Sequence, residues 1–524
     1  MFERTAAWVR WSVVGVCCGV PIVWALAMVA LHPATLREAW PVDGRGAVLL
    51  RTLGVNATAA LLAVGLGAMV FRALRYRVGV MSAAVALAMP GLVWAYAGAE
   101  ALRWLGPFAP QSWPDVARGI VSLGLWLWPV PAVMLAVSAG RLDGSVLQAA
   151  DLDGARRRVA MRLLVPAALA GGAAAFALAT GTFAVWDASG IRVTSTVVRT
   201  VFDTGTFVEG VAVGLSSPDA RAASAISTAL PTVVVTLAAL VIAVRFARTA
   251  GGYGTAGMNA IESHGGVAAG LRRVIVVSLA ALPVGVLVLN LPTLAVDPRP
   301  YLGALAHGIS LALLVGLVTV LLGATALVGR PTITLALAMS AFLLGGQWLA
   351  IAWIRLLNQP VPEPLLSISD WVYGGDAVVV LAHVGRFGWL GLAAGWFAWS
   401  PGMRGLRRQA AVDGASAWRT FLHVTLPTNA IPLIAAGLGA AALALGEIQA
   451  TVLLVPDTLP PRMATWLHIA ADRAMTEASV VLAVAVGLFA LTAATVSFLS
   501  GDQRELCRNA ECGMMNAEVE TPTA

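Results

Sequence analysis

Long apolar stretches alternate with short polar segments along the whole chain. A helix needs roughly 17–25 consecutive apolar residues to cross the hydrocarbon core of a bilayer. Stretches of this length predict membrane-spanning helices at 12–31, 52–70, 80–102, 119–140, 166–186, 226–244, 274–296, 304–328, 332–357, 375–399, 427–447 and 479–499. The first follows two arginines, as in a signal peptide, but its apolar core is too long and lacks a small-residue cleavage site. We therefore expect an all-α integral membrane protein with about 12 transmembrane helices.

The composition indicates that lipid is the main solvent of this chain. Of 524 residues, 59% are hydrophobic and 12% are charged, whereas a soluble domain has about 25% charged residues. This excludes a soluble globular protein and a disordered chain. Cys17 and Cys18 lie in the first apolar stretch, and Cys507 and Cys512 lie in the polar tail without a histidine nearby. We therefore expect neither a disulfide framework nor a zinc site.

The basic residues indicate an orientation in the membrane. All 34 are arginine, and the formal net charge is +7. No basic stripe is interleaved with aromatic residues, so we expect no nucleic-acid partner. With a cytoplasmic N-terminus, the cytoplasmic segments hold 21 arginines, and external segments of almost equal total length hold 11. This excess predicts cytoplasmic N- and C-termini.

A short motif occurs twice, 260 residues apart. Gln148–Ala155 follows the fourth apolar stretch, Arg408–Ala415 follows the tenth, and both copies end in Asp-Gly-Ala. A proline, Pro166 or Pro427, stands at the start of the next stretch in each half. The repeat predicts two parallel six-helix halves. They span 1–247 and 274–500, with a flexible glycine-rich linker at 248–273 and a polar cytoplasmic tail at 501–524.

Each copy of the motif has the composition of a helix, a turn and a second helix. The alanines favour helix and allow a partner to approach the backbone closely. Gly154 and Gly414 suit a left-handed residue that ends one helix and starts a turn. Pro166 and Pro427 suit the first turn of the next membrane helix. No catalytic chemistry is present, so the pattern indicates a docking site for a partner, formed twice per chain.

The two loops resemble the EAA motif of ABC-importer permeases, which reads Glu-Ala-Ala, three residues, Gly, and then about a dozen residues to a Pro. In that family the loop forms the coupling helix, which sits in a groove of the cytosolic ATPase. The family's Glu is Gln148 in the first copy and Arg408 in the second. The resemblance assigns ATPase coupling to Gln148, Ala149, Ala150, Asp153, Gly154 and Pro166, and to Arg408, Gln409, Ala410, Asp413, Gly414 and Pro427.

The resemblance extends to about 48–247 and 304–500, and it is greatest to ferric-iron permeases with two fused membrane domains. Leu445–Pro456 is similar to a late segment of those permeases, and Phe183–Asp187 resembles its first-half equivalent. The resemblance implies the type I importer fold, a bacterial inner-membrane location, a cytosolic ATPase dimer that binds the ATP, and an external substrate-binding protein. It implies ferric iron as the substrate, with thiamine, polyamines and oxyanions as alternatives. No cofactor is expected in this chain.

Three ionisable residues are candidates for the translocation pathway, because charges inside a bilayer are costly and face a pathway or a bundle interior. Glu447 closes the eleventh stretch, and Asp187 holds the corresponding place after the fifth. Each is equally consistent with an interfacial carboxylate bonded to backbone. For Arg386, in the tenth stretch, a structural pairing is favoured over substrate contact. Gln347 is expected to hydrogen-bond across helices.

Other functional classes find less support in the residues. The chain contains no lysine and therefore no G-x-x-x-x-G-K-[ST] loop, so ATP hydrolysis is expected on a separate chain and not here. A secondary transporter would also fit twelve spans in two halves, but the few acidic residues lie mostly near the span ends. A polytopic membrane enzyme would need a catalytic cluster, and the best candidate segment, 187–225, lacks metal-like spacing.

Overall fold

The computed structural model describes residues 2–36, 45–104, 114–140, 142, 144–208, 211–212, 217–249, 266–291, 297–360, 363–397, 401–454, 456–469 and 471–519. The elements up to residue 249 are α1 (Phe2–Val14), α2 (Val20–Leu31), α4 (Arg45–Val70), α5 (Arg77–Ala88), α6 (Gly91–Trp104), α7 (Pro114–Leu127), α8 (Pro129–Gly140), α9 (Gly144–Leu152), α10 (Arg156–Thr180), α11 (Ala184–Ala188), α12 (Thr194–Thr204), β1 (Thr206–Val208), β2 (Val211–Ala212) and α13 (Pro218–Thr249). The two short strands pair antiparallel.

The remaining elements are all helical. They are α15 (Gly266–Leu289), α16 (Arg299–Ala326), α17 (Thr332–Leu344), α18 (Gly346–Leu357), α19 (Glu363–Tyr373), α20 (Ala377–Phe387), α21 (Trp389–Phe397), α22 (Pro401–Val412), α23 (Ala417–Thr420), α24 (Leu426–Leu445), α25 (Thr451–Leu454), α26 (Leu459–His468) and α27 (Asp472–Val519). Most of the predicted linker, 250–265, lies outside the described residues. The predicted tail continues α27 as helix to Val519, and the side chains of Cys507 and Cys512 lie outside the described part.

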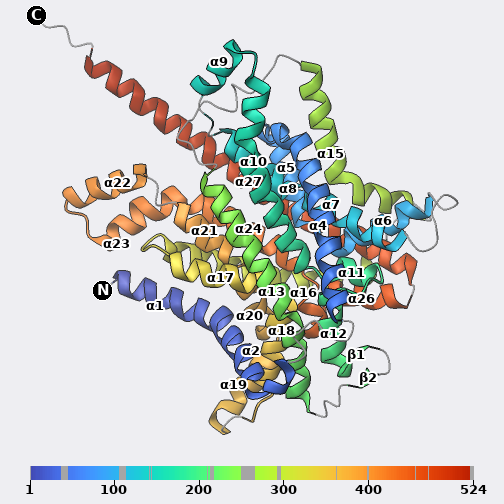
Figure 1. Ribbon diagram of the computed structural model, residues 1–524. Helices are drawn as coiled ribbons and strands as arrows, with labels where there is room; N and C mark the ends of the chain where they lie inside the picture. Colours follow the sequence, from blue (N-terminus) through green and yellow to red (C-terminus); the bar gives the residue numbers. More distant parts are fainter. Residues whose placement is uncertain are drawn as a thin grey trace, which may run out of the picture.

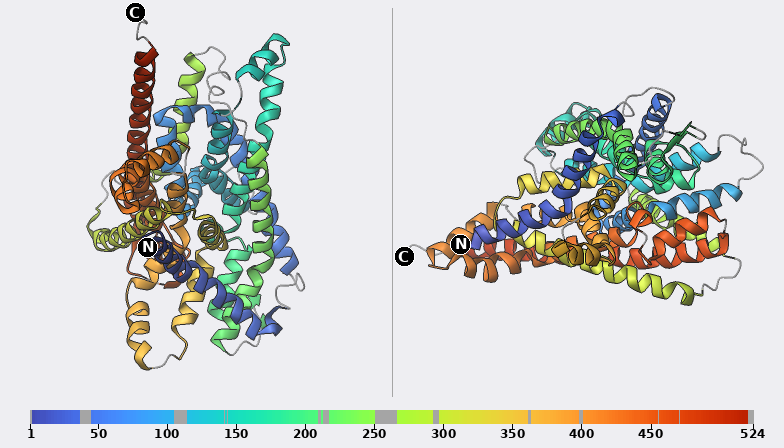
Figure 2. Two further views of the ribbon diagram at one scale, coloured as in Figure 1. Left: turned by 90° about the vertical axis from the view of Figure 1, so that its left-hand side faces the viewer. Right: turned by 90° about the horizontal axis from the view of Figure 1, so that it is seen from below.

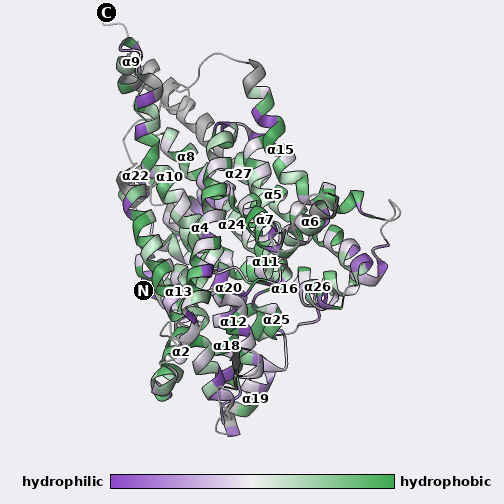
Figure 3. Cartoon of the chain, turned by 45° about the vertical axis from the view of Figure 1, so that its right-hand side comes forward, coloured by the Kyte–Doolittle hydropathy of each residue, from purple (hydrophilic) through white to green (hydrophobic). Residues whose placement is uncertain are grey.

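The prediction of a multi-span helical membrane protein is confirmed. In the described residues, nine helices are long and apolar enough to cross a membrane, and three bent pairs raise the total to twelve if each pair is one span. Each of the twelve predicted stretches overlaps one of these helices or pairs, and residues 292–296 and 398–399 of two stretches lie outside the described part. Large apolar side chains such as Leu61, Leu289 and Ile333 are exposed, as expected of a surface that faces lipid. Hydrophilic residues gather near helix ends, as at α9 and α19 (Figure 3).

Two of the predicted spans are sharply broken. α5 and α6 meet at 93°, and α17 and α18 meet at 97°. At the first break, Pro90 has no N–H to continue the helix and forces Met89 into an extended ψ of 130°. At the second, Gly345 has φ 88° and ψ 156°, a conformation that a side chain disfavours. These breaks occur in the third and ninth predicted spans.

Small residues allow the central helices to approach closely. α16 packs against α24 and α21, and a Cβ atom on Gly316 would lie 2.8 Å from the carbonyl oxygen of Gly437. A Cβ atom on Gly391 would overlap the carbonyl oxygen of Thr319. Glycine is therefore required where these backbones cross, as is common between helices in membranes.

The two sequence halves interlock. α1 packs against α16 and α17, and α2 packs against α18, although both belong to the N-terminal half. Conversely, α15 packs against α4, α5 and α6. Arg10 on α1 fixes the first of these contacts, because its Nη1 donates to the carbonyls of Thr325 (2.9 Å) and Gly329 (3.1 Å). Each half thus completes the packing of the other.

Candidate functional site

The two motif copies fold alike at α9 and α22. Gly154 and Gly414 follow these helices with φ 63° and 79°, the left-handed conformation expected from the sequence. The Ala155 N–H donates to the carbonyl of Ala150 (2.8 Å), and the Ala415 N–H donates to that of Ala410 (2.9 Å). This reverse bond satisfies a carbonyl at the helix end and fixes the turn into the next helix.

Both short helices present apolar side chains to solvent at matching positions. Leu152 is 91% exposed and Val412 is 86% exposed, each just before the Asp-Gly pair. Val146 and Leu406, six residues earlier, are also exposed. α9 and α22 both project from the body on the side where the C-terminal part of α27 extends (Figures 1 and 2), whereas the β1–β2 hairpin lies on the other side. The two helices thus carry exposed apolar residues at matching positions and project from the same side of the molecule.

The assigned loop residues are mostly at the surface. Ala150 is buried and Ala410 is half-buried, while the remaining residues before each turn are exposed: Gln148, Ala149, Asp153, Gly154, Arg408, Gln409, Asp413 and Gly414. The side chains of Arg156 and Arg157 lie outside the described part.

Both prolines lie inside a helix that begins earlier in the chain. Pro166 lies inside α10, which begins at Arg156. Pro427 is the second residue of α24, but α24 continues α23 through a π-helical turn at Phe421–Thr425, and the whole helix begins at Ala417. The prediction that each proline starts the membrane helix is therefore wrong, because the stretch before each proline and the membrane span form one continuous helix.

The second loop has a contact that sequence reasoning missed. The ring of Phe2 on α1 packs against the rings of Trp418 (centroids 4.8 Å apart) and Phe421 (5.1 Å). Arg407 on α22 donates to the carbonyl of Leu327 at the end of α16 (2.7 Å). The aromatic residues are visible in the sequence, but nothing in it indicates that residue 2 meets residue 418.

Arg386 and Glu447 form a buried ion pair. Arg386 Nη1 donates to Glu447 Oε1 at 2.6 Å and to Gln449 Oε1 at 2.8 Å, and the two charged side chains are only 11% and 6% exposed. Glu447 Oε1 also accepts from the Ala450 N–H (3.0 Å), and Gln449 Oε1 accepts from the Gly346 N–H (3.2 Å). This network joins α20, the end of α24 and the break between α17 and α18, and it matches the structural pairing weighed for Arg386.

Asp187 lies apart from that network. Its carboxylate is 3.7 Å from Arg199 Nη1 and 3.3 Å from His468 Nε2. Burial raises the pKa of the Asp187 carboxyl above its ordinary value, and the charges of Arg199 and His468 act in the opposite direction. The structure therefore places Asp187 with partners from α12 and α26, and not beside Glu447.

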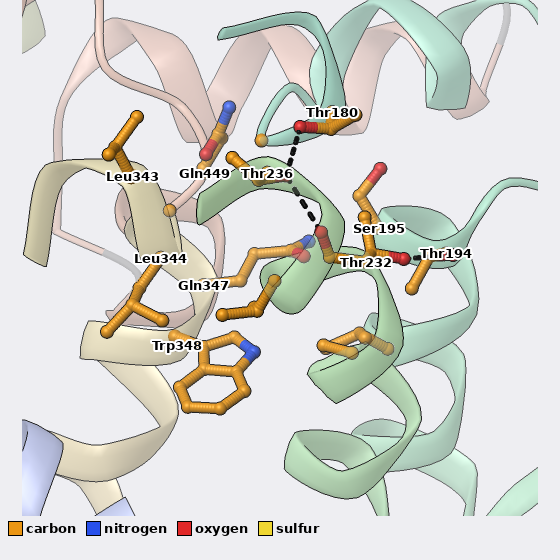
Figure 4. Close-up of a pocket in the computed structure, with 15 residues that line it drawn as sticks. Thr180, Thr194, Ser195, Thr232, Thr236, Leu343, Leu344, Gln347, Trp348 and Gln449 are labelled. Carbon is orange, nitrogen blue, oxygen red and sulfur yellow. Dashed lines mark hydrogen bonds between the residues drawn. The ribbon is translucent and has the colours of Figure 1, made fainter. Parts of the chain in front are cut away.

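A small cavity lies between the two sequence halves, at the break before α18. Its volume is about 40 Å³, room for about three water molecules. Figure 4 shows its polar lining: Thr180, Thr194, Ser195, Thr232 and Thr236 on one side, and Gln347, Trp348 and Gln449 on the other. Sequence reasoning missed this hydroxyl cluster. The available signal was Thr232 and Thr236, one turn apart in an apolar span.

The described residues include no group of three or more His, Cys, Asp or Glu side chains that could hold a metal ion. No protein-family model, curated protein or solved structure matches this chain. The functional conclusion therefore rests on the motif and on the geometry above.

Proposed function

We propose that this chain is the membrane-spanning permease subunit of an ATP-driven importer, built as two parallel six-helix halves in a bacterial inner membrane. It hydrolyses no ATP itself. A cytosolic ATPase dimer docks on α9 and α22, and an external binding protein delivers the cargo. The observation that carries this proposal is the pair of helix–turn–helix loops. They expose apolar residues at matching positions, and α9 and α22 project from the same side of the molecule (Figure 1).

The loops have the properties of a docking surface and lack those of a reactive site. Leu152 and Val412 lie at equivalent points of α9 and α22 and project fully into solvent. Exposed apolar residues that cluster on one surface mark contacts with a protein or a membrane, and in our proposal these loops lie on the cytosolic side. A partner with two equivalent grooves would satisfy both, which fits a dimer with two-fold symmetry.

The interior supports movement of one half against the other. Each half contributes one sharply broken span, with bends of 93° and 97°, and the cavity lies between the halves. Discontinuous helices near the middle of a membrane, with a site at the interface of two repeats, are typical of transporters. In our proposal, closure of the ATPase dimer pulls on α9 and α22 and opens this interface in alternation to the two sides.

The cargo follows from the resemblance, which favours ferric iron over thiamine, polyamines and oxyanions. In the described part of the chain the cavity is lined by hydroxyl and amide groups and by no carboxylate, whereas hard cations prefer carboxylate ligands. In this proposal the binding protein therefore retains the tight iron ligands, and the permease contacts the cargo only weakly.

The test is uptake by cells that lack their own copy of this chain and carry wild type or a variant. Labelled ferric iron, thiamine and sulfate are supplied separately. Leu152→Glu combined with Val412→Glu should abolish ATP-dependent uptake, and the matched Leu152→Met with Val412→Met should retain it. Gly414→Pro should also abolish uptake while the chain still inserts. Normal uptake by the glutamate variant, or uptake driven by a proton gradient without ATP, would overturn the proposal and favour a secondary transporter.

A further inference from the structure

The first turn of α18 faces the cavity between the halves. Gly346, Gln347 and Trp348 open this twelve-residue helix, and the last two line the cavity. The amide N–H groups of a first helical turn have no partner within their own helix, and they carry the positive end of the helix dipole. The Gly346 N–H is satisfied by Gln449 Oε1 at 3.2 Å. The break at Gly345 is therefore what brings a helix N-terminus to this point inside the membrane.

A buried amide donor lies beside this N-terminus. Gln347 is 6% exposed, and its Nε2 has no acceptor among the residues that the structure describes. Figure 4 shows its side chain reaching from α18 across the cavity toward Thr232 on α13. The indole Nε1 of Trp348 is likewise buried without an acceptor in the described part of the chain. A buried donor without a partner costs free energy, so these groups indicate a missing acceptor.

The opposite wall adds threonine hydroxyl groups that already donate within the chain: Thr180 Oγ1 donates to the Ala177 carbonyl and Thr236 Oγ1 to the Thr232 carbonyl, both at 2.8 Å. Thr180 Oγ1 and Thr236 Oγ1 are 2.8 Å apart, and Thr232 Oγ1 donates to Thr194 Oγ1 at 3.0 Å. These hydroxyl groups would have to rotate away from their present acceptors to donate to a ligand.

Among the residues that the structure describes, no charged side chain lines the cavity. Arg386 and Glu447 lie directly beside Gly346, where an added Cβ would overlap both side chains, and the two charges pair with each other. The lining thus combines a helix N-terminus with the buried N–H donors of Gln347 and Trp348, and the Glu447 carboxylate beside it is neutralised by Arg386.

We propose that this cavity binds an oxyanion group of the cargo, such as a carboxylate, sulfate or phosphate, at the N-terminus of α18 with Gln347 as a donor. Helix N-termini bind such groups because their amides and dipole both favour negative charge. The role as a cargo contact rests on the proposed permease function. It implies that iron crosses this point only within an anionic complex, and not as the bare cation.

The binding step is testable without the ATPase or the binding protein. The purified chain in detergent is titrated with sodium sulfate, phosphate or citrate, and with ferric citrate, at an ionic strength held constant with chloride. Thermal unfolding is followed by tryptophan fluorescence. We expect a saturable rise in the unfolding temperature with at least one oxyanion and none with chloride or thiamine. Sulfate and phosphate report a free inorganic anion, and citrate and ferric citrate report an organic or chelated one.

The variants distinguish this site from others. Gln347→Leu and Thr232→Val should each weaken the binding of that anion at least tenfold, and Gln347→Glu should abolish it by charge repulsion. Asn358→Leu, at the exposed far end of α18, is the matched control and should bind like wild type. Equal binding by wild type and the folded Thr232→Val and Gln347→Glu variants, or no anion effect on wild type, would overturn the inference. Neither result would contradict the permease proposal, which is tested separately by ATP-dependent uptake.

Discussion

The ion pair between Arg386 and Glu447 gives a quantitative prediction about stability. Glu447→Gln keeps the side-chain shape and the acceptor for the Ala450 N–H, but it removes the negative charge 2.6 Å from Arg386 Nη1. A buried arginine without its counter-charge destabilises a fold by about 3–5 kcal/mol. Because Gln449 Oε1 remains at 2.8 Å, we expect the lower end, about 3 kcal/mol.

The double variant separates charge from packing. Arg386→Met with Glu447→Gln leaves no buried charge in the network, and replacing both members of such a pair is often nearly neutral. We expect it to lie within about 1 kcal/mol of wild type. Arg386→Met alone leaves Glu447 buried without its counter-charge and should also cost about 3 kcal/mol, so the coupling energy of the cycle is about 5 kcal/mol.

The assay is reversible unfolding in mixed detergent–SDS micelles, followed by tryptophan fluorescence, for wild type, both single variants and the double variant. Strictly additive free energies would refute the reasoning, because they would mean that the two side chains do not depend on each other. A Glu447→Gln variant as stable as wild type would refute it as well, since Arg386 would then be satisfied by Gln449 alone.

Three further predictions concern the loops, the helix contacts and the titration of a buried acid. Gly414→Ala should lower the free energy of unfolding by about 1–2 kcal/mol, because Gly414 has a φ of 79°. Gly405→Ala, inside α22 with open space around it, should raise the free energy of unfolding by about 1 kcal/mol. Thermal unfolding should therefore show a lower unfolding temperature for the first variant and a higher one for the second. Gly391→Ala should lower the yield of folded chain, measured by size-exclusion chromatography, because the new Cβ overlaps the α16 backbone. Gly439→Ala should leave the yield unchanged, because no atom lies near the new Cβ. Burial raises the pKa of Asp187 from 3.8, so the folded state loses stability as pH rises from about that value through the raised pKa. The free energy of unfolding of wild type should therefore fall relative to that of Asp187→Asn as pH rises above 3.8, and a constant difference between the two proteins would contradict this.

Local chemistry explains why much of the architecture could be read from the residues. The length of each apolar stretch decides whether a helix crosses the membrane, and all twelve stretches overlap described helices or bent pairs. The turn after α9 and α22 depends on one glycine that can take a left-handed conformation, and both glycines do so. The two-half arrangement and the partners of these loops stay predictions.

Contacts between distant segments could not be read in the same way. The sequence shows that Arg386 and Glu447 are costly in a membrane, but only helix packing decides that they meet each other. It predicts that Gln347 hydrogen-bonds across helices, but the 97° bend at Gly345 brings its amide to a cavity walled by threonines of the other half, where its Nε2 has no acceptor in the described part of the chain. A run of basic residues before Pro166 looks like a separate helix, yet α10 continues through it.

The sequence by itself therefore determined that the chain lies in lipid, where the membrane-spanning helices fall and where the two glycine turns form. Hydrophobic length and backbone freedom are properties of neighbouring residues, and this is why they can be read from the sequence. Only the tertiary structure decided which buried polar groups are satisfied and which are left with free donors. That depends on how helices cross, and crossings are fixed by contacts such as Gly316 against Gly437, more than a hundred residues apart. The oxyanion site we infer belongs to this second class.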